Sequence, residues 1–114
     1  MQRGQVWLHE SPTRKPRPVL ILSRDSAIGL LRTVVGVPAT RSIRNIPTEV
    51  PLDESDGMRK SCVLSTDNIG PYNKAYLTRH LTTLSSERMA QVCHALSLAI
   101  DCSSRHAARS EPQG

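Results

Sequence analysis

The chain has 114 residues, with 15 Lys and Arg against 10 Asp and Glu, and its only aromatic residues are one Trp and two Tyr. This length suits one domain with one hydrophobic core and excludes two. The net charge of +5 and the pI of about 9.6 favour a polyanionic partner, while the shortage of aromatic rings leaves little for stacking on bases.

The charge is distributed unevenly along the chain. Residues 11–48 hold seven basic residues and a single acid, Asp25, whereas residues 49–67 hold five acids against Arg59 and Lys60. We therefore expect a dipolar molecule. The cysteines at 62, 93 and 102 form no CxxC pair, which predicts free thiols, and the chain shows neither a leader pattern nor a long apolar run. These features predict a cytoplasmic protein.

In chain order, residues 5–9 (QVWLH) read as a short strand, and residues 10–16, with two prolines, as a loop. Residues 17–25 (RPVLILSRD) contain an apolar run that is typical of a buried central strand. Proline cannot donate to a ladder, so Pro18 is expected at the first position of this strand, with Arg17 at the mouth of the sheet. Arg17 then either caps the strand and faces water or offers its planar donors to a phosphate.

The middle of the chain predicts several more short strands. We expect a turn at 26–30, a strand at 32–40 with Pro38 at an edge or a bulge, and a polar connection at 41–47. Further strands are predicted at 48–52, 61–67 and 78–83, separated by a charged turn at 53–60 and a turn-rich crossing at 68–74. Short strands at near-regular spacing, without alternating helices, predict a small antiparallel β-barrel.

The hydrophobic period changes to that of a helix after Ser85, the expected N-cap of a helix at 85–101. The predicted apolar face carries the helical spacing of Met89, Val92, Cys93, Leu96 and Ile100. Residues 103–114 (SSRHAARSEPQG) lack any apolar pattern and are predicted to be a disordered tail, so the single domain is expected at 1–102.

Several segments in fixed order resemble the MazF/PemK family: RGQVW, RPVLILSRD, VGVPATRS, PTEVPL, STDNI and LTTLSSERMAQVCHALSLAI. Members are toxin endoribonucleases (mRNA interferases) of type II toxin–antitoxin pairs, and the resemblance extends from Arg3 to about Ile100. It implies an SH3-like antiparallel β-barrel with a C-terminal helix, shared with the CcdB gyrase poisons. It also implies a homodimer that binds single-stranded RNA across its groove, and an acidic, MazE-like antitoxin.

Carried over by position, the resemblance assigns the catalytic arginine to Arg17 and the catalytic threonine to Thr40, and Asp67 matches an acid of the Kid-like members. Ser65 occupies the place of an arginine in those members, and His9 does not match their loop histidine, so the proton carriers stay open. The predicted RNA contacts are basic or amide side chains near these positions: Arg14, Lys15, Arg41, Arg44 and Asn68.

RNA cleavage without a metal requires the charge that builds on the phosphorane to be stabilised. Arg17 suits that task, and Thr40 could donate a hydrogen bond to a non-bridging oxygen. Asp67 either orients Arg17 or a base, or caps the turn at Asn68. No His, Asp and Glu cluster has metal-ligand spacing, so neither metal nor cofactor is expected. The resemblance implies products with 2′,3′-cyclic phosphate and 5′-hydroxyl ends.

Two other classes of function remain open at this stage. One is a CcdB-like toxin that traps a topoisomerase without chemistry. The other is a basic barrel that only binds nucleic acid. The second explains the charge, but neither explains why both Arg17 and Thr40 match the catalytic positions of the family.

Overall fold

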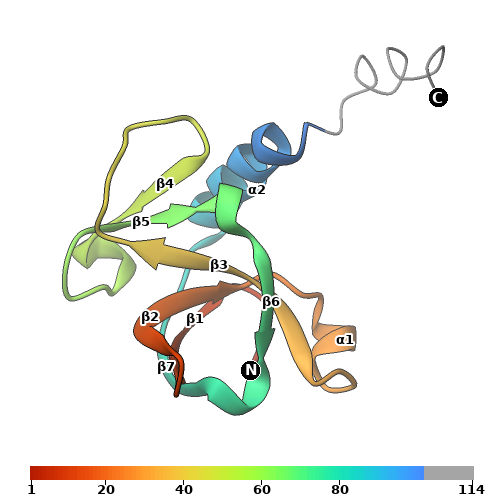
Figure 1. Cartoon of the computed structure of the whole chain (residues 1–114). Coiled ribbons are helices and arrows are strands. Elements are labelled where there is room, and N and C mark those ends of the chain that lie inside the picture. The colour runs from red at the N-terminus through yellow and green to blue at the C-terminus, as the bar shows by residue number, and fades with distance from the viewer. Residues whose placement is uncertain (102–114) are drawn as a thin grey trace, which may run out of the picture.

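The structure is a computed structural model, and residues 1–101 are described here. One antiparallel sheet has the strand order β4-β5-β3-β2-β1-β7, with β6 paired to β3 beside this path (Figure 1). The sheet does not close into a complete barrel, because its outer strands β4 and β7 do not pair with each other. The predicted class, antiparallel β with a C-terminal helix, is confirmed, whereas the barrel is open. The strands are β1 (Gln5–Ser11), β2 (Arg14–Ile21), β3 (Thr33–Thr40), β4 (Glu49–Leu52), β5 (Cys62–Ser65), β6 (Gly70–Asn73) and β7 (Leu77–Thr83).

The first two strands form a hairpin. The sequence did not predict it, because the prolines at 12 and 16 are typical of a loop. Ser11 pairs with Arg14 across a two-residue turn, and a bulge lies between His9 and Ser11. The loop predicted at 10–16 is therefore wrong. β2 starts at Arg14, so Arg17 and Pro18 lie within the strand rather than at its start.

Pro18 nevertheless limits the pairing of β2 on its other side. The backbone N–H of Leu22 donates to Val35 O on β3, and strand geometry turns every second nitrogen of β2 the same way. The nitrogen of Pro18 therefore faces β3 without a hydrogen to donate, and the β2–β3 ladder begins only at Val19. Beyond that point the two strands separate.

β3 changes its partner along its length. Residues up to Gly36 pair with β6, and Ala39 and Thr40 pair with β5. Pro38 lies between the two sets of pairs, on an interior strand, so the predicted edge or bulge at this residue is wrong. Its nitrogen points toward the β6 side, where β6 has already ended, and the missing donor costs no ladder bond.

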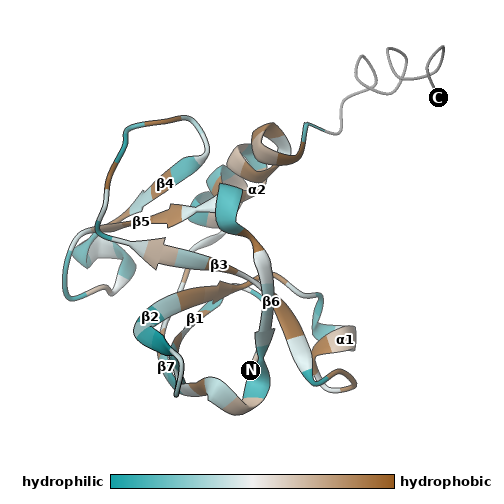
Figure 2. Cartoon of the chain, viewed as in Figure 1, coloured by the Kyte–Doolittle hydropathy of each residue, from teal (hydrophilic) through white to brown (hydrophobic). Residues whose placement is uncertain are grey.

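The sheet carries a hydrophobic cluster on each face. The larger one joins Val6, Leu20 and Val37 to α2 (Ser86–Ile100) through Val92 and Ala95. The smaller one gathers Val19, Ile21, Val34, Tyr72 and Leu77, with Trp7 packed against it. Figure 2 shows hydrophobic residues on the inner parts of β2 and β5 and along α2. Side chains on both faces of β2 are therefore buried, as the apolar run of this strand predicted.

The C-terminal helix begins after Ser85, whose side chain accepts a hydrogen bond from the backbone N–H of Arg88. Its buried side differs in part from the predicted one, since Val92 and Ala95 are buried while Cys93 and Ile100 are exposed. Arg88 also forms an ion pair with Asp56 at 3.0 Å, which fixes the helix to the loop before β5.

Short helices occupy four of the connections between strands. The turn predicted at 26–30 is in part the helix α1 (Asp25–Ile28), and the crossing predicted at 68–74 contains strand β6. The 3₁₀ turns are η1 (Glu54–Asp56), η2 (Thr66–Asn68) and η3 (Lys74–Tyr76). Within residues 1–101, no helix is long and apolar enough to cross a membrane. The predicted tail at 103–114 lies outside the described residues.

Candidate active site

The main cleft of the described chain opens where β2 and β3 separate, and its volume is about 1150 Å³. Its walls come from β2, the end of β3, the loop between η1 and β5, and β7. Four of the residues predicted from sequence line it: Lys15, Arg17, Thr40 and Arg41. The last β2–β3 pair is Val19 with Pro38, so Arg17 and Thr40 lie two residues beyond it on facing strands.

Thr40 is half-buried at the end of β3, where its Oγ1 accepts a hydrogen bond from the backbone N–H of Ser42 at 3.1 Å. This bond uses the oxygen as an acceptor and leaves the hydroxyl hydrogen available to a ligand. Arg17 is exposed, and its guanidinium donates to no other described residue. The lining of the cleft therefore combines a hydroxyl donor with a planar cation that has no hydrogen-bond partner within residues 1–101.

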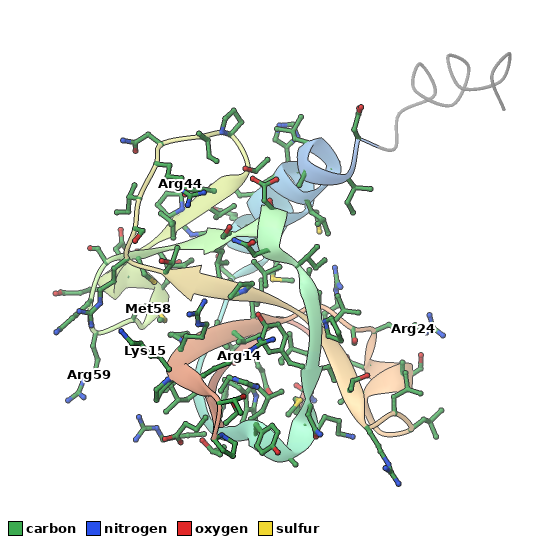
Figure 3. The ribbon with its side chains drawn as sticks, in the orientation of Figure 1. Arg14, Lys15, Arg24, Arg44, Met58 and Arg59 are labelled. Atoms are coloured by element: carbon green, nitrogen blue, oxygen red, sulfur yellow. The ribbon has the colours of Figure 1, made fainter. Side chains whose placement is uncertain are left out.

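Four other predicted residues lie outside this cleft. Asp67 accepts a hydrogen bond from Thr48 Oγ1 at 2.5 Å, and Asn68 Nδ2 donates to Ser65 Oγ at 2.8 Å. Both residues belong to η2, so the structure does not bring Asp67 beside Arg17. Arg14 and Arg44 are exposed elsewhere, and Figure 3 shows Arg44 apart from Lys15 and Arg59.

The cleft also contains basic residues that the sequence did not single out: Arg59, Lys60, Arg79 and His80. Figure 3 shows Lys15, Met58 and Arg59 gathered at the same edge of the molecule. Gly57, in the left-handed conformation with φ of 87°, ends η1 just before Met58 and Arg59. The segment 49–67 looked acidic in the sequence, yet none of its acids lines the cleft.

The electrostatics of the cleft are strongly positive. Its lining includes six Lys or Arg residues together with His80, and it includes neither Asp nor Glu. A cleft with charge of one sign concentrates ligands of the opposite sign, in this case a polyanion. His80 stacks on Trp7 with ring centroids 5.6 Å apart, so its ring also packs against the smaller core.

Two further groups show which chemistry this cleft can support. Cys62 lies in the lining, and burial raises the pKa of its thiol, so it stays protonated and is a poor nucleophile. Within residues 1–101, no three His, Cys, Asp or Glu side chains are grouped so that they could hold a metal ion. The groups left to act on a ligand in the cleft are cations, hydroxyls and the imidazole of His80.

A small open antiparallel sheet with a basic cleft and a C-terminal helix is the architecture of a particular class of protein. Sequence comparison identifies that class. The chain belongs to the family of PemK-like, MazF-like toxins of type II toxin–antitoxin systems, which it matches over residues 2–100. It is 38% identical to the probable endoribonuclease MazF5 of Mycobacterium tuberculosis over 102 residues, covering 89% of this chain and 94% of that protein. It is 32% identical to the endoribonuclease MazF3 of the same species, over 82% of this chain and 91% of that protein.

Solved structures agree with this assignment. An endoribonuclease in complex with its cognate antitoxin, from a mycobacterial species, superposes with a TM-score of 0.82 at 28% identity, covering 90% of this chain and 97% of that chain. The M. tuberculosis toxin MazF-mt6 superposes with a TM-score of 0.79 at 29% identity, covering 87% of this chain and 98% of that chain. The open sheet and its terminal helix are therefore the fold of the MazF toxins.

Proposed function

We propose that this toxin is an endoribonuclease that cuts single-stranded RNA at specific sequences without a metal ion, by attack of the 2′-hydroxyl on the adjacent phosphorus. Family membership and the curated relatives make it a toxin endoribonuclease. The observation that supports the cleavage chemistry is the cleft whose lining brings Arg17 and Thr40 together with further cations. We expect the toxin to act in the cytoplasm.

In this reaction the 2′-oxygen forms a bond to phosphorus and loses its proton, and the 5′-oxygen leaves and gains one. The products are a 2′,3′-cyclic phosphate and a 5′-hydroxyl. Negative charge gathers on the non-bridging oxygens of the pentacoordinate phosphorus. Arg17 stabilises that charge with two parallel N–H donors, and Thr40 donates its hydroxyl hydrogen to one of the same oxygens.

The other cations of the cleft bind the phosphates on either side of the cut. Lys15 and Arg41 lie close to Arg17 and Thr40 in the sequence, and Arg59 and Lys60 line the same cleft from the loop before β5. Each such contact releases counterions, so RNA affinity should fall steeply as salt increases. We expect Arg14, Arg44 and Asn68, which lie outside the cleft, to contribute less, and Asp67 to act as a turn residue bound to Thr48.

The experiment that tests this function is direct. The purified protein is incubated with a mixed RNA, and new 5′ ends are mapped, together with the chemical form of the 3′ ends. Cuts within a short shared sequence, ending in cyclic phosphate, are expected from the wild type. A protein that binds RNA without producing new ends would show a binding module, and ends bearing a 5′-phosphate would contradict the 2′-hydroxyl mechanism.

The partner of this toxin is expected to be an acidic antitoxin, since one of the similar structures is a complex with a cognate antitoxin. The positive cleft offers Asp and Glu side chains the same sites as phosphates. An acidic segment that folds on binding would then exclude RNA. Competition measures this: an antitoxin peptide that saturates the toxin while RNA affinity stays unchanged would contradict a shared site.

We also expect a homodimer. Leu98 on α2 is 47% exposed, and a second groove of about 400 Å³ runs between β4 and α2, lined by Val50, Ala90 and Ala95 among others. Apolar surface of this kind suits a symmetric interface between two copies. Light scattering at micromolar concentration checks the expectation, and a monomer would contradict it.

A further inference from the structure

His9 lies beside Arg17 on the neighbouring strand and is the histidine that does not match the loop histidine of the family. The two residues are paired across the β1–β2 hairpin, so their side chains leave the sheet on the same face. Only 5% of His9 is exposed. Its ring meets Tyr72 and Tyr76 edge-on, with centroids 5.1 and 6.0 Å away, and these two walls hold it in place.

The Nδ1 atom of His9 is buried and has no hydrogen-bond partner among the residues that the structure describes. A buried polar atom without a partner costs about 1–3 kcal/mol, so such an atom in a native fold calls for an explanation. One explanation is that its partner arrives in another state of the protein. Arg17 is paired with His9 through the backbone and has a long side chain whose guanidinium donates to no other described residue.

The surroundings of His9 keep its ring neutral near pH 7. Burial lowers the pKa of His9 below its ordinary value, and the positive charges of Arg14 and Arg17 on β2 lower it further. The groups that face it from β6 and η3 are the rings of Tyr72 and Tyr76, and burial raises the pKa of Tyr72. On β7 its paired residue is Leu77.

The acid nearest to His9 in the chain is committed elsewhere, since Glu10 accepts a hydrogen bond from Thr78 Oγ1 at 2.5 Å. Among residues 1–101, the charges that shift the pKa of His9 are those of the two arginines. A neutral imidazole has one nitrogen with a free lone pair, which can accept a hydrogen bond from a guanidinium. A protonated ring would offer only hydrogens and would repel the same group.

Resting on the function proposed above, we propose that His9 is a positioning residue for Arg17, whose guanidinium donates one hydrogen bond to His9 Nδ1 and turns its other donors toward the scissile phosphate. Arg17 lines the cleft and His9 does not, so the contact is made on the side of Arg17 that lies next to β1. Nδ1 is closed to solvent and out of reach of a 2′-hydroxyl, which argues against His9 as the general base. Fixing the guanidinium restricts an exposed side chain that is otherwise free to adopt many rotamers.

Two substitutions of His9 separate positioning from packing. In His9→Asn, the amide oxygen lies near the place of Nδ1 and can accept the same hydrogen bond, whereas His9→Leu fills the space without an acceptor. We expect His9→Leu to lower kcat by about 10-fold to 10²-fold, as expected for a misplaced catalytic group, with KM and melting temperature close to wild type. His9→Asn should restore most of the rate. Arg24→Leu, at an exposed position that lines neither the cleft nor the groove between β4 and α2, is the control.

The pH dependence gives a readout that a structural role would not produce. Wild-type kcat should fall on the acid side as His9 gains a proton and releases Arg17, and His9→Asn should lack this fall because an amide does not titrate. Full activity of His9→Leu, or equal losses in the Leu and Asn variants, would overturn the proposal. A loss of rate that tracks a loss of melting temperature would overturn it as well.

An NMR titration of the His9 ring separates this inference from the proposed function, because it requires no cleavage. The ring should titrate below pH 6.5, the ordinary pKa of histidine, and its pKa should rise when Arg17 is replaced by Met. An unchanged pKa in Arg17→Met would overturn the pairing of the two residues, even if the wild type cuts RNA. Absence of cleavage with the expected titration would instead refute the proposed function alone.

Discussion

Replacing Arg17 by Ala is the sharpest test of the cleavage site, because the structure predicts a large effect on rate and almost none on folding. Arg17 is exposed, and its guanidinium has no partner among the described residues. The free energy of unfolding should therefore change by less than about 0.5 kcal/mol. Loss of one preorganised transition-state donor should lower kcat by about 10² to 10³, equivalent to about 2.7–4 kcal/mol.

The assay follows single-turnover cleavage of an RNA that contains the mapped site, beside thermal melting of each protein. The same RNA with a 2′-deoxy nucleotide at the cut measures binding alone. Five Lys and Arg residues remain in the cleft of Arg17→Ala, so the affinity should fall modestly. The slope of log K against log salt should fall by about 0.7, the value for one phosphate contact on a single strand.

Two controls define the outcome. Arg24→Ala removes an exposed arginine that bonds to Ser26 outside the cleft, and it should leave cleavage unchanged. Arg17→Lys keeps the charge without the planar fork and should recover only part of the rate. Cleavage by Arg17→Ala at the wild-type rate, or a drop in melting temperature as large as the drop in activity, would refute the assignment of Arg17 to the transition state.

Three further predictions follow from the same site. Thr40→Ala should lower kcat about 10-fold while Thr40→Ser retains most activity, since only the hydroxyl is used, and equal losses in both variants would contradict this role. Cleavage should persist in EDTA, and a rate that collapses on chelation and returns with magnesium would refute the metal-free reaction. The stability of the fold should fall below pH 6.5, the ordinary pKa of histidine, because the folded-state pKa of His9 is lowered and the unfolded chain then binds more protons. This acid-side loss of melting temperature should disappear in His9→Leu.

The sequence by itself determined the class of fold, because its signals are local. Alternating and apolar runs specify strands, and the Ser85 cap with the spacing after it specifies the helix. The family resemblance of the sequence also predicted Arg17 and Thr40 as site residues, and both line the cleft. Pro18 ends the pairing of β2 with β3, and Pro38 lies between the residues of β3 that pair with β6 and those that pair with β5. The cleft opens where the pairing of β2 with β3 ends.

The hairpin at residues 10–16 shows the limit of local signals. Its prolines are typical of a loop, yet cross-strand pairing to β2 and β7 holds β1 in extended form as far as Ser11. The partner change of β3 could not be predicted either, because it depends on where two distant strands end. The buried face of α2 differs in part from the predicted face, because the shape of the sheet decides which helical side chains are buried.

Only the tertiary structure decided the composition of the site. Arg59 and Lys60 belong to a stretch that is acidic along the chain, and the turn at Gly57 places them in the cleft while its acids stay outside. His9 precedes the expected loop in sequence, but the hairpin register pairs it with Arg17. Charge and contact depend on distances between residues far apart in the chain, which the tertiary fold sets and local sequence patterns do not encode.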